Sequence, residues 1–156
     1  MIAEHCEILE TWNHLKDKTI TMKHSNDHKQ ALILAAGQGR VYKLGPMTAI
    51  FKADVDETDN KYSISEWWLD PNSDGPGAHQ HEDQDQIFYV LEGTISMQIG
   101  DKWTDAAKGT FIRIPKNTIH TFANRTAVQA GMLNFDIPGG FEKNMPSMVK
   151  WFEENK

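Results

Sequence analysis

Two stretches of the chain decide the fold: residues 77–93, GAHQHEDQDQIFYVLEG, and residues 109–124, GTFIRIPKNTIHTFAN. The first holds His79 and His81 one residue apart. In a strand, positions i and i+2 point to the same face, so both imidazoles are expected to enter one cavity. The second holds His120, just after a turn built from Pro, Lys and Asn. Neutral imidazole is the commonest protein ligand for zinc, iron, copper and nickel. The two stretches make these three histidines a candidate metal site, while surface or structural histidines are the alternative.

Around these stretches, short β-rich runs alternate with breakers such as Gly-Pro, Asp-Asn, Glu-Gly and Asn-Arg. Many short strands at close and regular spacing are typical of an antiparallel sandwich or barrel. No stretch of ten residues in this part of the sequence has the periodicity of a helix, which disfavours β-α-β units. The expected strands are residues 41–44, 47–52, 62–69, 77–81, 86–91, 94–99, 110–114, 119–124 and 128–135.

The segments before and after the predicted barrel have helical rather than β patterns. Residues 1–39 are expected to form an N-terminal helix and a linker, residues 40–137 the barrel, and residues 138–156 a C-terminal helix packed on the barrel. The leading helix is predicted from one apolar stripe, and the trailing helix from another that follows an early proline. The stripes are Ile8, Leu9, Trp12 and Leu15, and Met145, Met148, Val149 and Phe152.

Composition narrows the class of protein. A chain of 156 residues has room for one domain with a sizeable core. Its formal net charge of −6 argues against nucleic acid and anionic membranes as partners. One cysteine, Cys6, leaves no internal disulfide and indicates a reducing compartment. An acidic, polar start and the lack of a long apolar run predict a cytoplasmic location.

The two stretches resemble the conserved motifs of the cupin superfamily. The first motif is a glycine, His-x-His, a carboxylate and a closing glycine, matched by Gly77, His79, His81, Gln86 and Gly93. The second motif is matched by Gly109, Pro115, Asn117, His120 and Asn124. Asn117 stands where the motif has glycine, and asparagine also tolerates a left-handed turn. The resemblance implies an all-β fold, the double-stranded β-helix or jelly-roll cupin barrel.

The resemblance also implies one divalent transition metal ion per barrel (Fe, Mn, Ni, Cu or Zn), held by His79, His81, His120 and a fourth ligand. Cupins usually have glutamate at the fourth position, which is Gln86 in this chain. A neutral amide oxygen would lower metal affinity and raise the Lewis acidity of the ion. Asp85 in a shifted register and Glu82 through the connecting turn are alternative ligands, and a vestigial site without metal stays open.

Residues beyond the histidines are candidates for the rest of the site. We expect Glu66, at the mouth of the barrel, to handle protons as the catalytic residue. Met47, Phe51, Trp68 and Phe122 are expected to line an apolar substrate pocket. Of the adjacent rings in SEWWLDP, one is expected to face the cavity and the other the outside, because neighbours in a strand point opposite ways.

Among cupins, the strings MTAIFKAD, SEWWLDP, GPGAHQH and PGGFE are similar to small quercetin-dioxygenase-like proteins. This similarity implies a metal-dependent oxidoreductase, a dioxygenase that acts on a small chelating substrate such as a flavonol, polyketide or diketone. Two other hypotheses are a non-catalytic cupin that binds or senses a small molecule, and a metal-dependent isomerase without redox chemistry. We expect a homodimer, since an unpaired edge strand favours pairing.

Overall fold

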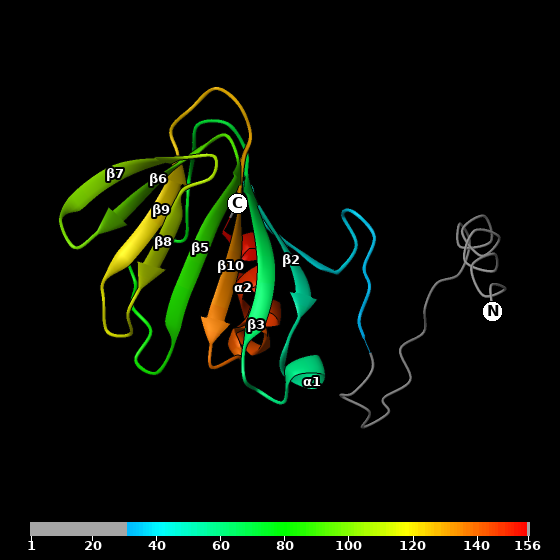
Figure 1. The fold of residues 1–156 in the computed structure, drawn as a ribbon. Coiled ribbons are helices and arrows are strands. Elements are labelled where there is room, and N and C mark those ends of the chain that lie inside the picture. Colours follow the sequence, from blue (N-terminus) through cyan, green and yellow to red (C-terminus); the bar gives the residue numbers. More distant parts are fainter. Residues whose placement is uncertain (1–30, 156) are drawn as a thin grey trace, which may run out of the picture.

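The computed structural model describes residues 31–155, and within them the fold is an antiparallel β-barrel of two sheets (Figure 1). The larger sheet has the order β1-β2-β3-β10-β5-β8 and the smaller sheet the order β4-β9-β6-β7. All strand pairs are antiparallel, as the sequence predicts for a jelly roll. The strands are β1 (Arg40–Leu44), β2 (Met47–Ala53), β3 (Ser63–Leu69), β4 (Ser73–Asp74), β5 (Asp85–Glu92), β6 (Thr94–Ile99), β7 (Lys102–Ala107), β8 (Phe111–Ile114), β9 (His120–Asn124) and β10 (Ala130–Ile137).

Three elements differ from the expected list. The stretch 77–81 is a loop rather than a strand, and only His79 forms an isolated bridge, to His120. The strands β4 and β7 were not expected. Strand β7, KWTDAA, buries only Ala106 and lies at the edge of its sheet, so it lacks the apolar alternation that marks a half-buried strand.

A short helix, α1 (Val55–Thr58), was also missed, although its start carries a recognisable signal. The Asp54 side chain accepts a hydrogen bond from the backbone N–H of Asp56 at 3.1 Å. The Glu57 side chain accepts one from the N–H of Asp54 at 2.9 Å. This reciprocal arrangement is a capping box, with Asp as the N-cap residue.

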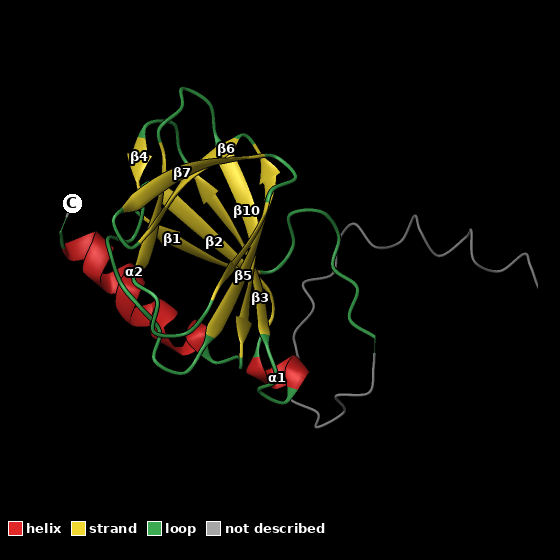
Figure 2. Cartoon of the chain, turned by 60° about the vertical axis from the view of Figure 1, so that its left-hand side comes forward, coloured by secondary structure: helices red, strands yellow, loops and turns green. Residues whose placement is uncertain are grey.

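The C-terminal helix is confirmed as α2 (Met145–Glu154), preceded by the 3-10 helix η2 (Phe141–Asn144). Pro146 lies in the first turn of α2, where its missing N–H costs no hydrogen bond. The helix runs along the outside of the barrel beside β1 (Figure 2), and Met145 is fully buried. The expected N-terminal helix lies outside the described residues. None of the described helices is long and apolar enough to cross a membrane.

Alternation in the strands sends every second side chain into the core. In β3 the buried positions are Ser63, Ser65, Trp67 and Leu69, while Ile64, Glu66 and Trp68 are only partly buried. The most deeply buried large side chains come from both sheets and from α2: Leu44, Met47, Phe51, Leu69, Phe88, Val90, Ile95, Ile114, Met132 and Met145.

Two left-handed turns hold the motifs together. Gly93 has φ = +65° between β5 and β6, and a Cβ there would lie 2.8 Å from the carbonyl oxygen of Gln129. Asn117 has φ = +60°, which confirms the expected left-handed conformation. Its backbone N–H donates to the carbonyl of His81 at 2.7 Å. The turn of the second motif is therefore bonded directly to the first.

Candidate metal centre and cavity

The structure brings the three predicted histidines together. His79 and His81 come from the loop before β5, and His120 opens β9. Two backbone hydrogen bonds join His79 to His120, at 3.0 and 2.9 Å, and align the loop with the strand. One ring nitrogen from each of the three side chains lies within 4.8 Å of the other two. The spacing of these nitrogens suits one ion held by three imidazoles.

Hydrogen bonds fix the tautomers of two rings. Nδ1 of His79 lies 2.9 Å from the carbonyl of Gly77, and Nδ1 of His120 lies 2.8 Å from the carbonyl of Thr118. A carbonyl only accepts, so each Nδ1 carries the proton and each Nε2 keeps its lone pair. This outer arrangement is the usual one for metal-binding histidines. Nε2 of His81 and of His120 is buried without a hydrogen-bond partner among the described residues, so the donor set fits a metal ion.

Burial favours the neutral form of His81 and of His120. Burial, reinforced by His79 and His120, lowers the pKa of His81 to about 4. Burial also lowers the pKa of His120, helped by His79 and opposed by the bond to Thr118. Near pH 7 both side chains are therefore in the deprotonated form that coordinates metals.

Register decides which residue of β5 faces the interior. Gln86 is 5% exposed and points inward. Asp85 points outward, where it pairs with Arg113 at 2.7 Å and accepts from the N–H of Lys116 at 2.9 Å. These two partners hold the pKa of Asp85 below its usual value. The shifted register that would make Asp85 a ligand is not adopted, and the other alternative, Glu82, is exposed.

Asp136 was missed at the sequence level and lies directly behind Gln86. It is fully buried in β10, and its carboxylate accepts from Nε2 of Gln86 at 2.9 Å and from Nδ2 of Asn134 at 3.0 Å. Burial, together with the nearby charge of Glu142, raises the pKa of Asp136 to about 6 against those two bonds. The available signal was the pair Asn134 and Asp136, polar at i and i+2 in the apolar run AGMLNFDI.

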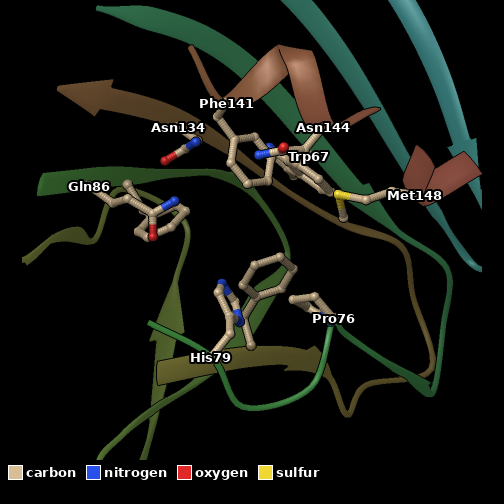
Figure 3. Close-up of a pocket in the computed structure, with 10 residues that line it drawn as sticks. Trp67, Pro76, His79, Gln86, Asn134, Phe141, Asn144 and Met148 are labelled. Carbon is tan, nitrogen blue, oxygen red and sulfur yellow. The ribbon is translucent and has the colours of Figure 1, made fainter. Parts of the chain in front are cut away.

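An apolar cavity of about 320 Å³ opens beside the histidines. Figure 3 shows His79 across the cavity from Trp67 and Phe141, with Gln86 and Asn134 together at one end. Trp67 packs edge-on against Phe122, with centroids 6.1 Å apart, and lies 6.2 Å from Phe141. The lining residues are Trp67, Pro76, His79, Gln86, Phe88, Phe122, Asn134, Phe141, Asn144 and Met148.

Three predicted pocket residues are not part of this lining, while Phe122 is. Met47 and Phe51 are fully buried in β2, where Phe51 packs against Tyr42. Trp68 lies on the outer face of β3, across Gly131, where a Cβ would come within 2.4 Å of its ring. Its neighbour Trp67 takes the inner position.

Glu66 also lies on the outer face, so its predicted role at the mouth of the barrel is not supported by its position. Its carboxylate pairs with Lys52 at 3.0 Å and accepts from Nε1 of Trp68 at 3.0 Å. Ile64, Glu66 and Trp68 share one face of β3, and that face is the outer one. The inner positions of β3 include Ser63 and Ser65, which are polar, so the sequence pattern does not mark this face as the buried one.

In chelator-treated protein, the buried groups Asp136 and His81 change the stability of the fold in opposite directions as the pH changes. Between pH 6.5 and 4 the unfolded chain protonates His81 and the folded protein does not, so stability falls as the pH drops. Between pH 3.8 and 6 the folded protein protonates Asp136 first, so stability falls as the pH rises. Relative to the wild type, Asp136→Asn should gain about 3 kcal/mol of unfolding free energy from pH 4 to pH 8.

Urea denaturation across this pH range measures the effect. His81→Asn is the matched control, because its stability relative to the wild type should rise in the opposite direction, from pH 8 to pH 4. A difference between Asp136→Asn and the wild type that does not change with pH would contradict the buried, ionised carboxylate.

Comparison with known proteins agrees with this geometry. Residues 65–136 match the family model described as the cupin domain. The chain is 29% identical over 120 residues to quercetin 2,3-dioxygenase of Bacillus subtilis, covering 70% of this chain but 32% of that protein. The chain therefore spans about a third of the length of that relative.

Two solved structures share the fold. An RmlC-like cupin from Shewanella frigidimarina is 14% identical, with a TM-score of 0.62 over 73% of this chain and 96% of the other. A predicted oxalate decarboxylase from Thermotoga maritima is 19% identical, with a TM-score of 0.56 over 59% of this chain and 80% of the other. The barrel and its histidines define a cupin with a three-histidine candidate metal site. Residues 65–136 match a cupin domain, and the barrel has the cupin fold.

Proposed function

We propose that this chain is a metal-dependent cupin enzyme that acts on a small chelating substrate, with dioxygenase chemistry as the leading candidate. The observation that carries the proposal is the convergence of three imidazoles beside an apolar cavity. The distant similarity of the chain to quercetin 2,3-dioxygenase supports oxidoreductase activity, while the shared fold is compatible with several chemistries.

The histidines would hold the ion from one side. His79, His81 and His120 supply three nitrogen ligands, and the inward amide of Gln86 is the best-placed fourth donor. A bound divalent ion with open positions supplies Lewis acidity, and a redox-active ion can also activate dioxygen. Because all four protein donors are neutral, the full charge of the ion is available to polarise a chelating ligand.

The cavity wall would orient and desolvate the substrate. Trp67, Phe122 and Phe141 form an aromatic wall that suits a flat, apolar body. Glu66 faces outward, and no carboxylate is among the described lining residues, so a proton would move on the substrate, on a ligand of the ion or through water.

One observation favours a second candidate, a non-catalytic cupin that binds or senses a small molecule. The fourth ligand position is a neutral amide, and among the described residues that line the cavity only His79 could act as an acid or base. Tight ligand binding with no turnover would support this alternative.

Metal analysis followed by oxygen uptake tests the proposal. Protein purified without chelator is analysed for metals, then reloaded separately with iron, manganese, nickel and copper. Each form is assayed with a flavonol and a β-diketone in an oxygen electrode. Consumption of oxygen that depends on metal and substrate is the expected result. Binding of the chelating ligand without oxygen uptake by any metal form would exclude the dioxygenase.

The two adjacent tryptophans offer a matched test of the cavity wall. Trp67→Ala should weaken binding of an aromatic ligand by roughly tenfold to a hundredfold, since burying a ring against aromatic neighbours is worth a few kcal/mol. Trp68→Ala, on the outer face, should change binding less than about twofold. Both variants are compared by calorimetric titration of metal-loaded protein with the same flavonol. Equal losses in both would show that the face of β3 is wrongly assigned.

A further inference from the structure

A buried carboxylate controls how two amides face the cavity. Asp136 accepts one hydrogen bond on each oxygen, from Nε2 of Gln86 at 2.9 Å and from Nδ2 of Asn134 at 3.0 Å. Both donors are amide nitrogens, so both amides turn their NH₂ groups toward Asp136 and their oxygens away from it. The hydrogen bond to Asp136 therefore fixes the orientation of each amide.

The consequence is a pair of buried acceptors. Oε1 of Gln86 and Oδ1 of Asn134 point away from Asp136, and both are buried without a partner among the described residues. Gln86 is 5% exposed and Asn134 is 1% exposed, and both line the cavity. A buried acceptor that no donor satisfies destabilises the protein, so both oxygens favour a ligand that carries donors.

Strand register places the two acceptors on one wall. Asp136 lies opposite Gln86 and Asn134 lies opposite Phe88 in the pairing of β10 with β5. Alternate residues of a strand share a face, so all four side chains point to the interior. Figure 3 shows Gln86 and Asn134 at the same end of the cavity. The described lining residues include no lysine or arginine that could neutralise an anion there.

We propose that Gln86 and Asn134, positioned by Asp136, form a two-acceptor site that selects ligands with N–H or O–H donors and disfavours carboxylates. The matching ligand has an uncharged polar head with at least one donor, on a flat apolar body that fits the aromatic wall. This selectivity deepens the proposed function, because it concerns the same cavity. In metal-free protein no ion competes for Oε1 of Gln86, so the selectivity can be tested there separately.

The test uses two probes that share a benzoyl group. Chelator-treated full-length protein at pH 8 is titrated with benzamide, whose NH₂ donates, and with methyl benzoate, which only accepts. The reporter is the indole N–H signal of Trp67, which lines the cavity and donates to Oγ of Ser65 at 3.0 Å. Benzamide should bind at least about tenfold more tightly, equivalent to ~1.4 kcal/mol.

Variants separate positioning from simple packing. In Asp136→Asn the new amide can donate, which lets one neighbour turn its own NH₂ toward the cavity, so the preference for benzamide should fall below about threefold. Asn134→Leu removes one acceptor at similar size and should reduce the preference even if Asp136→Asn does not fold. Glu66→Gln, on the outer face, should keep the full preference.

Equal binding of the two probes by the wild type, or no response to either, would overturn the proposal. An unchanged preference in folded Asp136→Asn, or in Asn134→Leu if the first variant does not fold, would also overturn it. Zinc binding by the three histidines is measured in parallel without probes. Loss of probe selectivity with intact zinc binding then counts against this inference alone, whereas absent zinc binding counts against the proposed function.

Discussion

His81→Asn is expected to lower the affinity for zinc by at least about 100-fold. Loss of an outer-shell partner alone commonly costs 10- to 100-fold, and His81 is placed to be a direct ligand. Nε2 of His81 is buried and unpartnered, so the ion is the group that would satisfy it. Calorimetric titration of chelator-treated protein with zinc at pH 7 measures the change, with Glu66→Gln as the control on the outer face.

The same variant should lose stabilisation by metal. At a free zinc concentration 100 times the dissociation constant, binding adds about 2.7 kcal/mol to the stability of the wild type. For a domain of this size, that gain raises Tm by roughly 8 °C. His81→Asn should show almost no rise at the same zinc concentration. A full rise in the variant would mean that the metal binds elsewhere.

Gln86→Glu restores the glutamate that cupins usually have at the fourth ligand position. As a single change, it should not strengthen zinc binding. Gln86→Glu replaces an N–H donor, 2.9 Å from the Asp136 carboxylate, with a second carboxylate oxygen. Two buried carboxylates at this separation cannot both ionise, so one retains its proton. We expect a loss of about 3 kcal/mol in unfolding free energy at pH 8, because one carboxyl must keep its proton well above its ordinary pKa, and little gain in zinc affinity.

The double variant Gln86→Glu with Asp136→Asn should behave differently. An amide at position 136 can donate to the new carboxylate, which leaves one negative charge facing the ion. Stability should return to within about 1 kcal/mol of the wild type, and zinc should bind at least about tenfold more tightly, or ~1.4 kcal/mol. Denaturation and zinc titration of the four proteins form a double-mutant cycle. Additive effects in this cycle would contradict direct contact between the two side chains.

The sequence was informative where local pattern and chemistry coincide. The motif resemblance grouped His79, His81 and His120 and implied a left-handed turn at Asn117, and the structure has both features, although residues 77–81 form a loop rather than the expected strand. The same motif placed Gln86 inside. These predictions depend on local geometry, which a short motif specifies.

Features decided by tertiary packing were beyond the sequence. Both faces of β3 carry large side chains, so its pattern could not say whether Trp67 or Trp68 faces the cavity. Glu66 shares the outer face with Trp68, so its position was mispredicted for the same reason. The edge strand β7 buries a single side chain, and Asp136 acquires its role only where β10 lies beside β5. A partner strand far along the chain determines each of these outcomes.

Anomalous diffraction from crystals supplied with a transition metal, recorded at the absorption edge of that metal, locates the bound ion. We expect one peak per chain, about 2.0–2.1 Å from a ring nitrogen of each of His79, His81 and His120 if the ion is zinc. A peak at another place, or none despite excess metal, would contradict this expectation.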